Sequence, residues 1–339
     1  MSLGYDVAIV GATGVVGESF LEILASRDFP IQNIYPLASE RSAGTQVQCG
    51  DKQYTVENLA EFDFSKVQFA FFSAGGAVSE EYAPKAAEAG AIVIDNTSQF
   101  RYQPNIPLVV PEVNPQALEN FRETNIISNP NCSTIQMLVA LKPIYDAAGI
   151  TRINVATYQA VSGAGNSAIE ELAKQTAALL NGQDVIVEQL SKQIAFNVVP
   201  EIDTRMENGY TREEMKMVWE TQKILNDPEV MVNPTAVRVP VFFGHSEAIN
   251  VETKRAITAE EVTQLLTDAE GVEVVAGNDF PTAVTHAATQ DKVYVGRIRD
   301  DISCSNGINL WVVADNVKKG AALNAVQIAE TLIKNNFYL

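Results

Sequence analysis

The stretch DVAIVGATGVVG, residues 6–17, decides the fold of this chain. It opens with an apolar run of strand length, residues 6–10, and continues with three glycines spaced GxxGxxG and a helical pattern that ends near Arg27. Glycine permits positive φ, lets a pyrophosphate approach the backbone and allows a helix to pack closely on a strand. Directly after a first strand, this pattern predicts a dinucleotide-binding turn, with a plain tight turn as the alternative.

Further apolar runs of strand length alternate with helical segments. We expect strands at residues 33–38, 69–73, 91–95 and 125–128, and a helix at 80–89. This alternation is typical of a parallel sheet. Ligands of such sheets bind outside the carboxyl ends of the strands. Three of those ends are polar or glycine-rich, and we expect them to line one crevice: residues 37–42, 73–76 and 95–101.

The end of the second strand bears on the choice of cofactor. An enzyme that uses NAD usually has an acidic residue there for the ribose, whereas Arg41 here stands between the hydroxyls of Ser39 and Ser42. A guanidinium suits a 2′-phosphate, which favours NADP. Glu40 could instead hold a ribose, and Arg41 could be an ordinary solvated loop residue. The residues expected to bind the cofactor in this half are Gly11, Thr13, Gly14, Val15, Val16, Ser39, Arg41, Ser42, Ser73 and Gly75.

The pattern changes after a helix expected at residues 133–148. Strands are expected at 152–162, 194–199, 237–243, 247–254, 292–299 and 308–313, with helices at 167–180, 213–225 and 259–269. These strands mostly follow one another, which indicates a sheet with one covered face. The predicted fold class is therefore α/β: a Rossmann-type NADP-binding domain plus an α+β domain with a mixed or antiparallel sheet.

Composition excludes several classes of protein. With 339 residues, 46% of them hydrophobic, two domains are expected. A formal net charge of −18 argues against nucleic acid and anionic membrane as partners. No signal peptide or membrane span is apparent, so we expect a cytoplasmic protein. Three cysteines without a Cys-x-x-Cys pair argue against disulfides, and only two histidines argue against a zinc site, so no metal is expected.

Cys132 is the candidate nucleophile. It closes the segment SNPNC, residues 128–132, directly before the helix expected from Ser133. The backbone N–H groups and the positive dipole end of a helix favour a thiolate over a thiol. The alternative is a small buried hydrophobic residue.

Eight segments spread along the chain carry a family resemblance. They are GATGVVG (11–17), LASERSAG (37–44), NTSQFR (96–101), NPNCST (129–134), YQAVSGAG (158–165), EEMK (213–216), RVPV (238–241) and GHSE (244–247). Together they are highly specific, and the chain resembles the aspartate-semialdehyde dehydrogenase family nearly end to end. The resemblance implies NADP-dependent, reversible conversion of L-aspartyl 4-phosphate to L-aspartate 4-semialdehyde and phosphate. This reaction leads towards lysine, threonine, methionine and diaminopimelate.

The resemblance also implies the catalytic groups. Cys132 would form a thioacyl intermediate as phosphate departs, and hydride from the cofactor would reduce it. His245 would be the base, although a histidine that caps a loop is the alternative. Gln159 would orient the acyl group through its amide, with a hydrogen bond at the sheet edge as the alternative.

Substrate binding is implied for four charged residues. Arg238 would bind the α-carboxylate and Glu213 the ammonium group, while Arg101 and Lys216 would hold the phosphate. Glu213 and Lys216 share a helix face at i,i+3, where an exposed ion pair is the commoner arrangement. The resemblance places four more residues at the cofactor: Ser162, Gly163, Gly165 and Asn316.

By resemblance, the domains are a dinucleotide-binding domain of residues 1–131, completed by a C-terminal helix within 315–339, and a catalytic and dimerisation domain of residues 132–314. A homodimer is expected. One alternative is N-acetyl-γ-glutamyl-phosphate reductase, whose acylated substrate has no charge to meet Glu213. Another is a non-catalytic NADP-binding paralogue, against which the presence of Cys132 and His245 argues.

Overall fold

Two units divide the chain in the computed structural model, which describes residues 4–335. The first unit extends to Pro130 and resumes at Ala321, and the second runs from Asn131 to Gly320. The second unit therefore begins one residue before Cys132. The chain returns to the first unit after residue 320, whereas the second domain predicted from the sequence ends at residue 314. Over residues 4–335, no helix is both long enough and apolar enough to cross a membrane.

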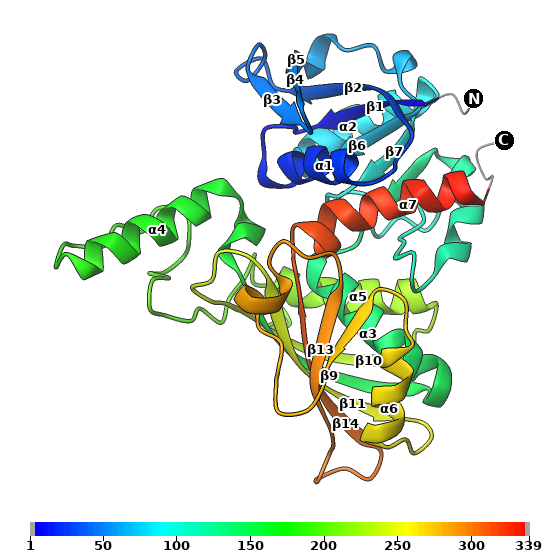
Figure 1. The fold of residues 1–339 in the computed structure, drawn as a ribbon, viewed down its shortest axis with the longest axis vertical. Coiled ribbons are helices and arrows are strands. Elements are labelled where there is room, and N and C mark those ends of the chain that lie inside the picture. Colours follow the sequence, from blue (N-terminus) through cyan, green and yellow to red (C-terminus); the bar gives the residue numbers. More distant parts are fainter. Residues whose placement is uncertain (1–3, 336–339) are drawn as a thin grey trace. The chain divides into compact units, whose positions relative to one another are not determined.

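The first unit is built on a six-stranded parallel sheet (Figure 1). Its spatial order is β5-β2-β1-β6-β7-β8. The strands are β1 (Tyr5–Val10), β2 (Ile31–Ala38), β5 (Glu57–Asn58), β6 (Phe69–Phe72), β7 (Ile92–Asp95) and β8 (Ile126–Ser128). A separate two-stranded sheet contains β3 (Gln46–Cys49) and β4 (Lys52–Thr55). The predicted Rossmann-type arrangement is confirmed.

The strand order reverses at β1, which lies between β2 and β6. Ligands of doubly wound sheets bind at this kind of switch point. Helix α1 (Val15–Ser26) follows the glycine turn after β1, and α2 (Gly76–Glu88) follows the turn after β6. The two turns with the strongest sequence signals therefore follow the two strands that meet at the switch point.

Two glycines of the first turn are there for steric reasons. Gly11 has a φ of +90°, and a Cβ on Gly17 would lie 2.1 Å from the carbonyl oxygen of Gly11. A side chain at position 17 would push α1 away from the turn that precedes it. Close packing of α1 therefore depends on glycine, which a plain tight turn would not require.

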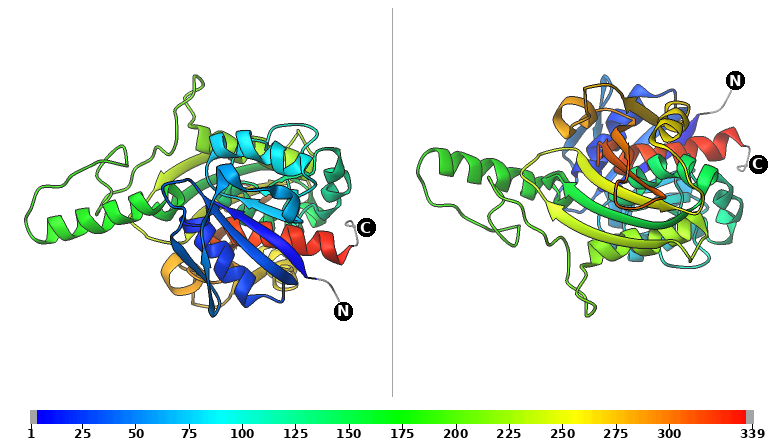
Figure 2. Two further views of the ribbon diagram at one scale, coloured as in Figure 1. Left: turned by 90° about the horizontal axis from the view of Figure 1, so that it is seen from above. Right: turned by 90° about the horizontal axis from the view of Figure 1, so that it is seen from below.

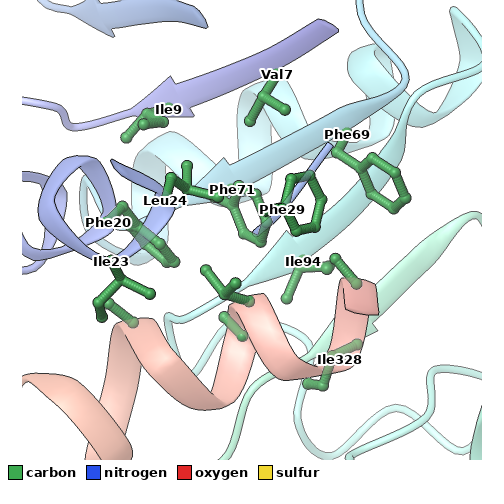
Figure 3. Packing of buried hydrophobic residues seen from close by; sticks show 14 of the residues in the cluster. Val7, Ile9, Phe20, Ile23, Leu24, Phe29, Phe69, Phe71, Ile94 and Ile328 are labelled. Atoms are coloured by element: carbon green, nitrogen blue, oxygen red, sulfur yellow. The ribbon is translucent and has the colours of Figure 1, made fainter. Parts of the chain in front are cut away.

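Helices α1 and α7 (Leu323–Lys334) contribute to the main hydrophobic core of the first unit. Figure 3 shows Phe20 of α1 and Ile328 of α7 packed near Phe71 and Ile94 of the sheet. The ring centroids of Phe20 and Phe71 lie 4.9 Å apart. A second hydrophobic cluster includes Ala8 of β1 and Ala83 of α2. The C-terminal helix therefore belongs to the core of the first unit.

The second unit contains a six-stranded mixed sheet of order β10-β9-β11-β14-β13-β12. Its strands are β9 (Ile150–Gln159), β10 (Met231–Arg238), β11 (His245–Thr253), β12 (Val272–Val275), β13 (Val293–Asp300) and β14 (Gly307–Ala314). The outermost pair at each edge is parallel, and the central pairs are antiparallel. The sheet is therefore mixed, the first of the two forms expected from the sequence.

Helix α3 (Cys132–Ala148) packs on the middle of this sheet and contacts α5 (Arg212–Leu225) and α6 (Ala259–Thr267). Helix α4 (Asn166–Leu180) extends away from the sheet of its own unit, as the views of Figure 2 show. Side chains alternate along β9, so that Thr157 and Gln159 are buried while Tyr158 is exposed. One face of the sheet is thus covered by helices, as expected.

Two strand predictions in this unit are wrong. Residues 194–199 are irregular and pair with the sheet only through the isolated bridge of Val199 to Arg238. Their apolar pattern comes from packing, because Ile194 and Ala195 are buried against Leu172 of α4. The strand expected at 237–243 ends at Arg238, and the residues after it form only irregular backbone hydrogen bonds, such as that from the Val161 N–H to the Val241 carbonyl.

Candidate active site

Cys132 is the first residue of α3. Asn131 caps the helix: its side-chain oxygen accepts hydrogen bonds from the N–H groups of Ser133, at 3.1 Å, and Thr134, at 3.4 Å. This cap favours a helix start at the cysteine rather than later. The thiol therefore stands at a helix N-terminus, where the backbone favours its ionised form.

Three more side chains of the candidate site lie at the ends of neighbouring strands. Gln159 ends β9, Arg238 ends the neighbouring β10 in register with it, and His245 begins β11 on the other side. The Nε2 atoms of Gln159 and His245 are 3.4 Å apart, and Arg238 Nη1 donates to the carbonyl of Ala160 at 2.8 Å. A Cβ on Gly163 would lie 3.1 Å from Arg238 Nη1 and 3.4 Å from His245 Nε2. Glycine at 163 therefore leaves room directly beside both groups.

Glu213 connects these strand ends to the helix that carries Cys132. One carboxylate oxygen accepts from Asn131 Nδ2 at 2.9 Å and from Gln159 Nε2 at 3.1 Å, and the other accepts from Lys216 Nζ at 2.9 Å. Burial alone would raise the pKa of Glu213, but the Lys216 charge and these hydrogen bonds lower it to about 2. The carboxylate is therefore ionised at neutral pH.

Lys216 is largely buried, unlike the lysine of a typical i,i+3 ion pair on a helix surface. Its side chain is 13% exposed and also contacts Asp203 at 2.9 Å. Burial would lower the pKa of Lys216, but Glu213 and Asp203 raise it above its usual value. The exposed-pair alternative is therefore wrong, and Lys216 brings a fixed positive charge to this cluster.

His245 is buried, and its orientation is set by the backbone. The Ala160 N–H donates to its Nδ1 at 3.0 Å, so the neutral ring carries its proton on Nε2. Burial and the charge of Arg238 lower the pKa of His245 to about 3, although Glu213 opposes this shift. The imidazole is therefore neutral over the physiological range.

Asn316 ties two loops of the second unit together. Its Oδ1 accepts from the Gly244 N–H at 2.9 Å, and its Nδ2 donates to Ser162 Oγ at 3.0 Å. The loop after β9 is thereby fixed to the turn before His245. Gly165, with φ +91°, precedes α4, and a Cβ there would contact nothing within 4 Å. Its role at the cofactor stays a prediction.

In the first unit, a pocket of about 510 Å³ opens at the switch point. Seven residues predicted to bind the cofactor line it: Gly11, Thr13, Gly14, Ser39, Arg41, Ser42 and Ser73. Val15, Val16 and Gly75 do not line it. Glu40 and Arg41 both line the pocket, so either side chain is available to the ribose of the cofactor. Its size and its glycine turn suit a nucleotide.

Arg101 lies in the first unit, on the turn after β7. It is buried, and its Nη2 donates to the carbonyl oxygen of Asn96 at 2.9 Å. Its role as a phosphate ligand stays a prediction. Within residues 4–335, no group of three or more His, Cys, Asp or Glu side chains has the arrangement of a metal site.

Several residues that hold the site residues in place are not predicted from the sequence. The Asn131 N–H donates to Glu220 at 2.6 Å, and Thr157 Oγ1 donates to Gln159 Oε1 at 3.0 Å. The asparagine before Cys132 is a recognisable N-cap signal. Glu220 and Thr157 have no such local signal, because their partners are brought to them only by the fold.

The chain is similar to known proteins along most of its length. Sequence models of two domains match the chain: "Semialdehyde dehydrogenase, NAD binding domain" over residues 6–121 and "Semialdehyde dehydrogenase, dimerisation domain" over residues 141–319. A curated relative, aspartate-semialdehyde dehydrogenase 2 of Vibrio cholerae, is 62% identical over 99% of this chain and 100% of its own length.

Solved structures are similar as well. Aspartate semialdehyde dehydrogenase II from Vibrio cholerae, complexed with ASA, matches with a TM-score of 0.97 and 62% identity over 98% of this chain and 99% of its own. Aspartate semialdehyde dehydrogenase with NADP from Candida albicans matches with a TM-score of 0.79 and 26% identity over 98% of this chain and 99% of its own.

The ionised state of Glu213 predicts how stability depends on pH. Its folded pKa of about 2 lies below the ordinary 4.5, so its stabilisation is complete above pH 4.5 and is lost as the pH falls towards 2. Glu213→Gln should lower the free energy of unfolding at neutral pH by up to about 3 kcal/mol and flatten its pH dependence across this window. Urea unfolding at a series of pH values measures both effects.

The matched control is Glu170→Gln, which removes an equal charge from an exposed i,i+4 pair with Lys174. It should keep the pH dependence of the wild type. An unchanged pH dependence in Glu213→Gln would show that folding does not lower the pKa of Glu213.

Proposed function

The chain belongs to the aspartate-semialdehyde dehydrogenase family, and from this we propose that it interconverts L-aspartyl 4-phosphate and L-aspartate 4-semialdehyde with a nicotinamide cofactor. The observation that carries the proposal is Cys132 at the N-terminus of α3, joined through Asn131 and Glu213 to Gln159. A thiolate held there is a suitable nucleophile for an acyl phosphate. A relative of 62% identity over the full length supports the same reaction.

In the proposed mechanism, the Cys132 thiolate attacks the acyl carbon, and the C–O bond to phosphate breaks. The product of this step is a thioester on Cys132 and inorganic phosphate. The Gln159 amide, fixed by Thr157 and Glu213, orients the acyl group beside His245. When bound, the dinucleotide supplies the hydride that reduces this thioester. Breakage of the C–S bond then releases the aldehyde and restores the thiolate.

Charged groups near the thiol fit the remainder of the substrate. Arg238 is buried beside the space left by Gly163 and would bind the α-carboxylate. Glu213, ionised and buried, would receive the ammonium group. Lys216 provides a positive charge for the phosphate, and we propose Arg101 as its second ligand. The Vibrio cholerae structure complexed with ASA supports this class of substrate.

For the cofactor, we propose NADP, held by the pocket at the switch point of the first unit. Gly11 and Gly14 line this pocket, where a glycine turn suits a pyrophosphate, and Arg41 between Ser39 and Ser42 suits the 2′-phosphate. We also propose that Val15, Val16 and Gly75 contribute through their backbone. The Candida albicans relative solved with NADP supports this choice.

We propose a homodimer formed through the open face of the second sheet, meaning the side chains of β9, β11 and β14 that point away from α3. Ala156 and Ala248 lie opposite each other on this face, and Tyr158 packs against Trp311 with ring centroids 5.5 Å apart. Tyr158 is 37% exposed. This face combines small and aromatic side chains with the amides of Asn154 and Asn250, and such a mixed surface suits a second copy of the chain. The match to a dimerisation domain supports it.

The reaction is tested by an assay with aspartate semialdehyde, phosphate and NADP. We expect NADPH formation that depends on phosphate, and Cys132→Ala should lower the rate by more than about 10⁴-fold while NADP still binds. Cys304→Ala, a thiol in the turn before β14, should keep the rate of the wild type. A higher rate with N-acetyl-glutamyl semialdehyde would overturn the substrate assignment, and no turnover with either aldehyde would overturn the reaction.

Arg41→Ala should weaken NADPH binding about tenfold relative to NADH, because a charge-assisted hydrogen bond to the 2′-phosphate is lost. Fluorescence titration with both dinucleotides measures the ratio. Glu40→Gln is the complementary variant and should leave the preference for NADPH intact. If Glu40→Gln weakens NADH and Arg41→Ala changes nothing, Glu40 holds the ribose and the enzyme prefers NAD.

The dimer is tested by sedimentation equilibrium. The wild-type chain should have the mass of two copies, and Ala156→Arg should produce monomers because it places a charge at the centre of the open face. Thr267→Arg, on the exposed side of α6, is the control and should remain dimeric. A dimeric Ala156→Arg would show that the copies meet elsewhere.

A further inference from the structure

Lys216 is held between two carboxylates, and only one of them belongs to the residues proposed for the substrate. Its Nζ donates to Glu213 Oε2 and to Asp203 Oδ2, each at 2.9 Å. An ammonium group has three N–H donors, so two of those of Lys216 are already occupied. One donor is left for an oxygen of the phosphate. The second carboxylate, Asp203, has no place in the reaction proposed above.

A loop brings Asp203 to the start of α5, although it lies 13 residues before Lys216. The N–H of Arg212, the first residue of α5, donates to the carbonyl oxygen of Thr204 at 2.8 Å. This bond closes the loop formed by residues 204–212. Asp203 directly precedes the loop, so its position is fixed by the backbone and not only by its contact with Lys216.

The backbone of Asp203 has a conformation that is uncommon for a residue with a side chain. Its φ is +68°, in the left-handed region, which aspartate and asparagine tolerate better than most residues. Oδ1 accepts a hydrogen bond from the Thr204 N–H at 2.7 Å, and Oδ2 accepts from Lys216. The two oxygens therefore have different partners, and the one that contacts Lys216 is held in place by the bond of the other to the loop.

All three groups of this cluster are charged at neutral pH. Burial would raise the pKa of Asp203, but the hydrogen bond and the charge of Lys216 lower it below its usual value. Glu213 is ionised, and Lys216 is protonated. The cluster therefore carries two negative charges and one positive charge. A phosphate that approaches Lys216 is repelled by both carboxylates as well as attracted by the ammonium group.

The two carboxylates differ in how easily a phosphate oxygen can replace them at Lys216. Glu213 is buried, and Asn131 and Gln159 also donate to it, so it is fixed in the site. The side chain of Asp203 is 31% exposed, and water can solvate its carboxylate when the bond to Lys216 is lost. Phosphate therefore replaces Asp203 at a lower cost than Glu213.

We propose that Asp203 is a positioning residue that competes with phosphate for Lys216 and thereby limits the affinity of the site for phosphate. This inference rests on the proposed function, because it requires Lys216 as a phosphate ligand. Phosphate is the group that departs when Cys132 forms the thioester. As it leaves, the Asp203 carboxylate binds the ammonium group of Lys216 again, which favours release of the product over its rebinding.

The competition is tested with Asp203→Asn, which removes the charge and keeps the shape of the side chain. Asparagine tolerates the left-handed φ, and its amide oxygen can still accept from Lys216. Calorimetric titration of the whole protein with inorganic phosphate requires no turnover. We expect the dissociation constant for phosphate to fall about fivefold in Asp203→Asn, because a competing charge is lost. An unchanged or higher constant would overturn the proposal.

The matched control is Glu201→Gln, which removes an equal charge two residues from Asp203, from an exposed ion pair with Arg205. Its dissociation constant for phosphate should equal that of the wild type, and a fall as large as in Asp203→Asn would contradict a specific role of Asp203. Lys216→Ala should weaken phosphate binding at least tenfold. If Lys216→Ala binds phosphate as the wild type does, the phosphate role of Lys216 in the proposed function is wrong, and the inference fails with it.

Steady-state kinetics distinguish this role from a structural one. In the assay with aspartate semialdehyde, phosphate and NADP, Asp203→Asn should lower the KM for phosphate about fivefold and change the KM for aspartate semialdehyde by less than about twofold. A general distortion of the site would raise both values. A higher KM for aspartate semialdehyde with an unchanged KM for phosphate would show that Asp203 serves the ammonium group of the substrate, and the proposal would be wrong.

Discussion

The buried carboxylate of Glu213 is the constraint on which the site depends. It accepts hydrogen bonds from Asn131, Gln159 and Lys216, which belong to three different segments of the second unit. An ionised carboxylate without these donors would be very costly to bury, so the fold must bring all three to it. The Asn131 cap of α3 and the Gln159 amide at the end of β9 are thereby fixed relative to each other.

The mixed sheet of the second unit explains how the remaining groups meet. Because β9 is parallel to β10 and antiparallel to β11, the carboxyl ends of β9 and β10 and the start of β11 lie at the same end of the sheet. Gln159, Arg238 and His245 occupy those positions. A purely antiparallel meander would place the end of β10 at the opposite end of the sheet, so the parallel pair is needed to bring Arg238 to the site.

The sequence reveals those parts of the structure that depend on neighbouring residues. The glycine turn at 11–17 and the helix that begins at Cys132 follow from local backbone geometry, and both are confirmed. The contact of Asn131 with Glu213 joins residues 82 positions apart, and no local pattern records it. The apolar run at 194–199 suits a strand or a packed loop equally well, which is why the strand predicted there is wrong. The tautomer of His245 follows from a backbone N–H that no side-chain pattern reveals.

The second unit begins one residue before Cys132, the proposed nucleophile, and its last residue lies against the same cysteine. A Cβ on Gly320 would come within 2.8 Å of Cys132 Cβ. The residues of the second unit that begin and end at these two connections therefore both lie beside Cys132. This has a consequence for protein engineering: circular permutation or domain insertion at either connection would displace Cys132, although such boundaries are usually the tolerant sites of a two-domain chain. The tip of α4, where Leu180 is 75% exposed, is the better place for new termini.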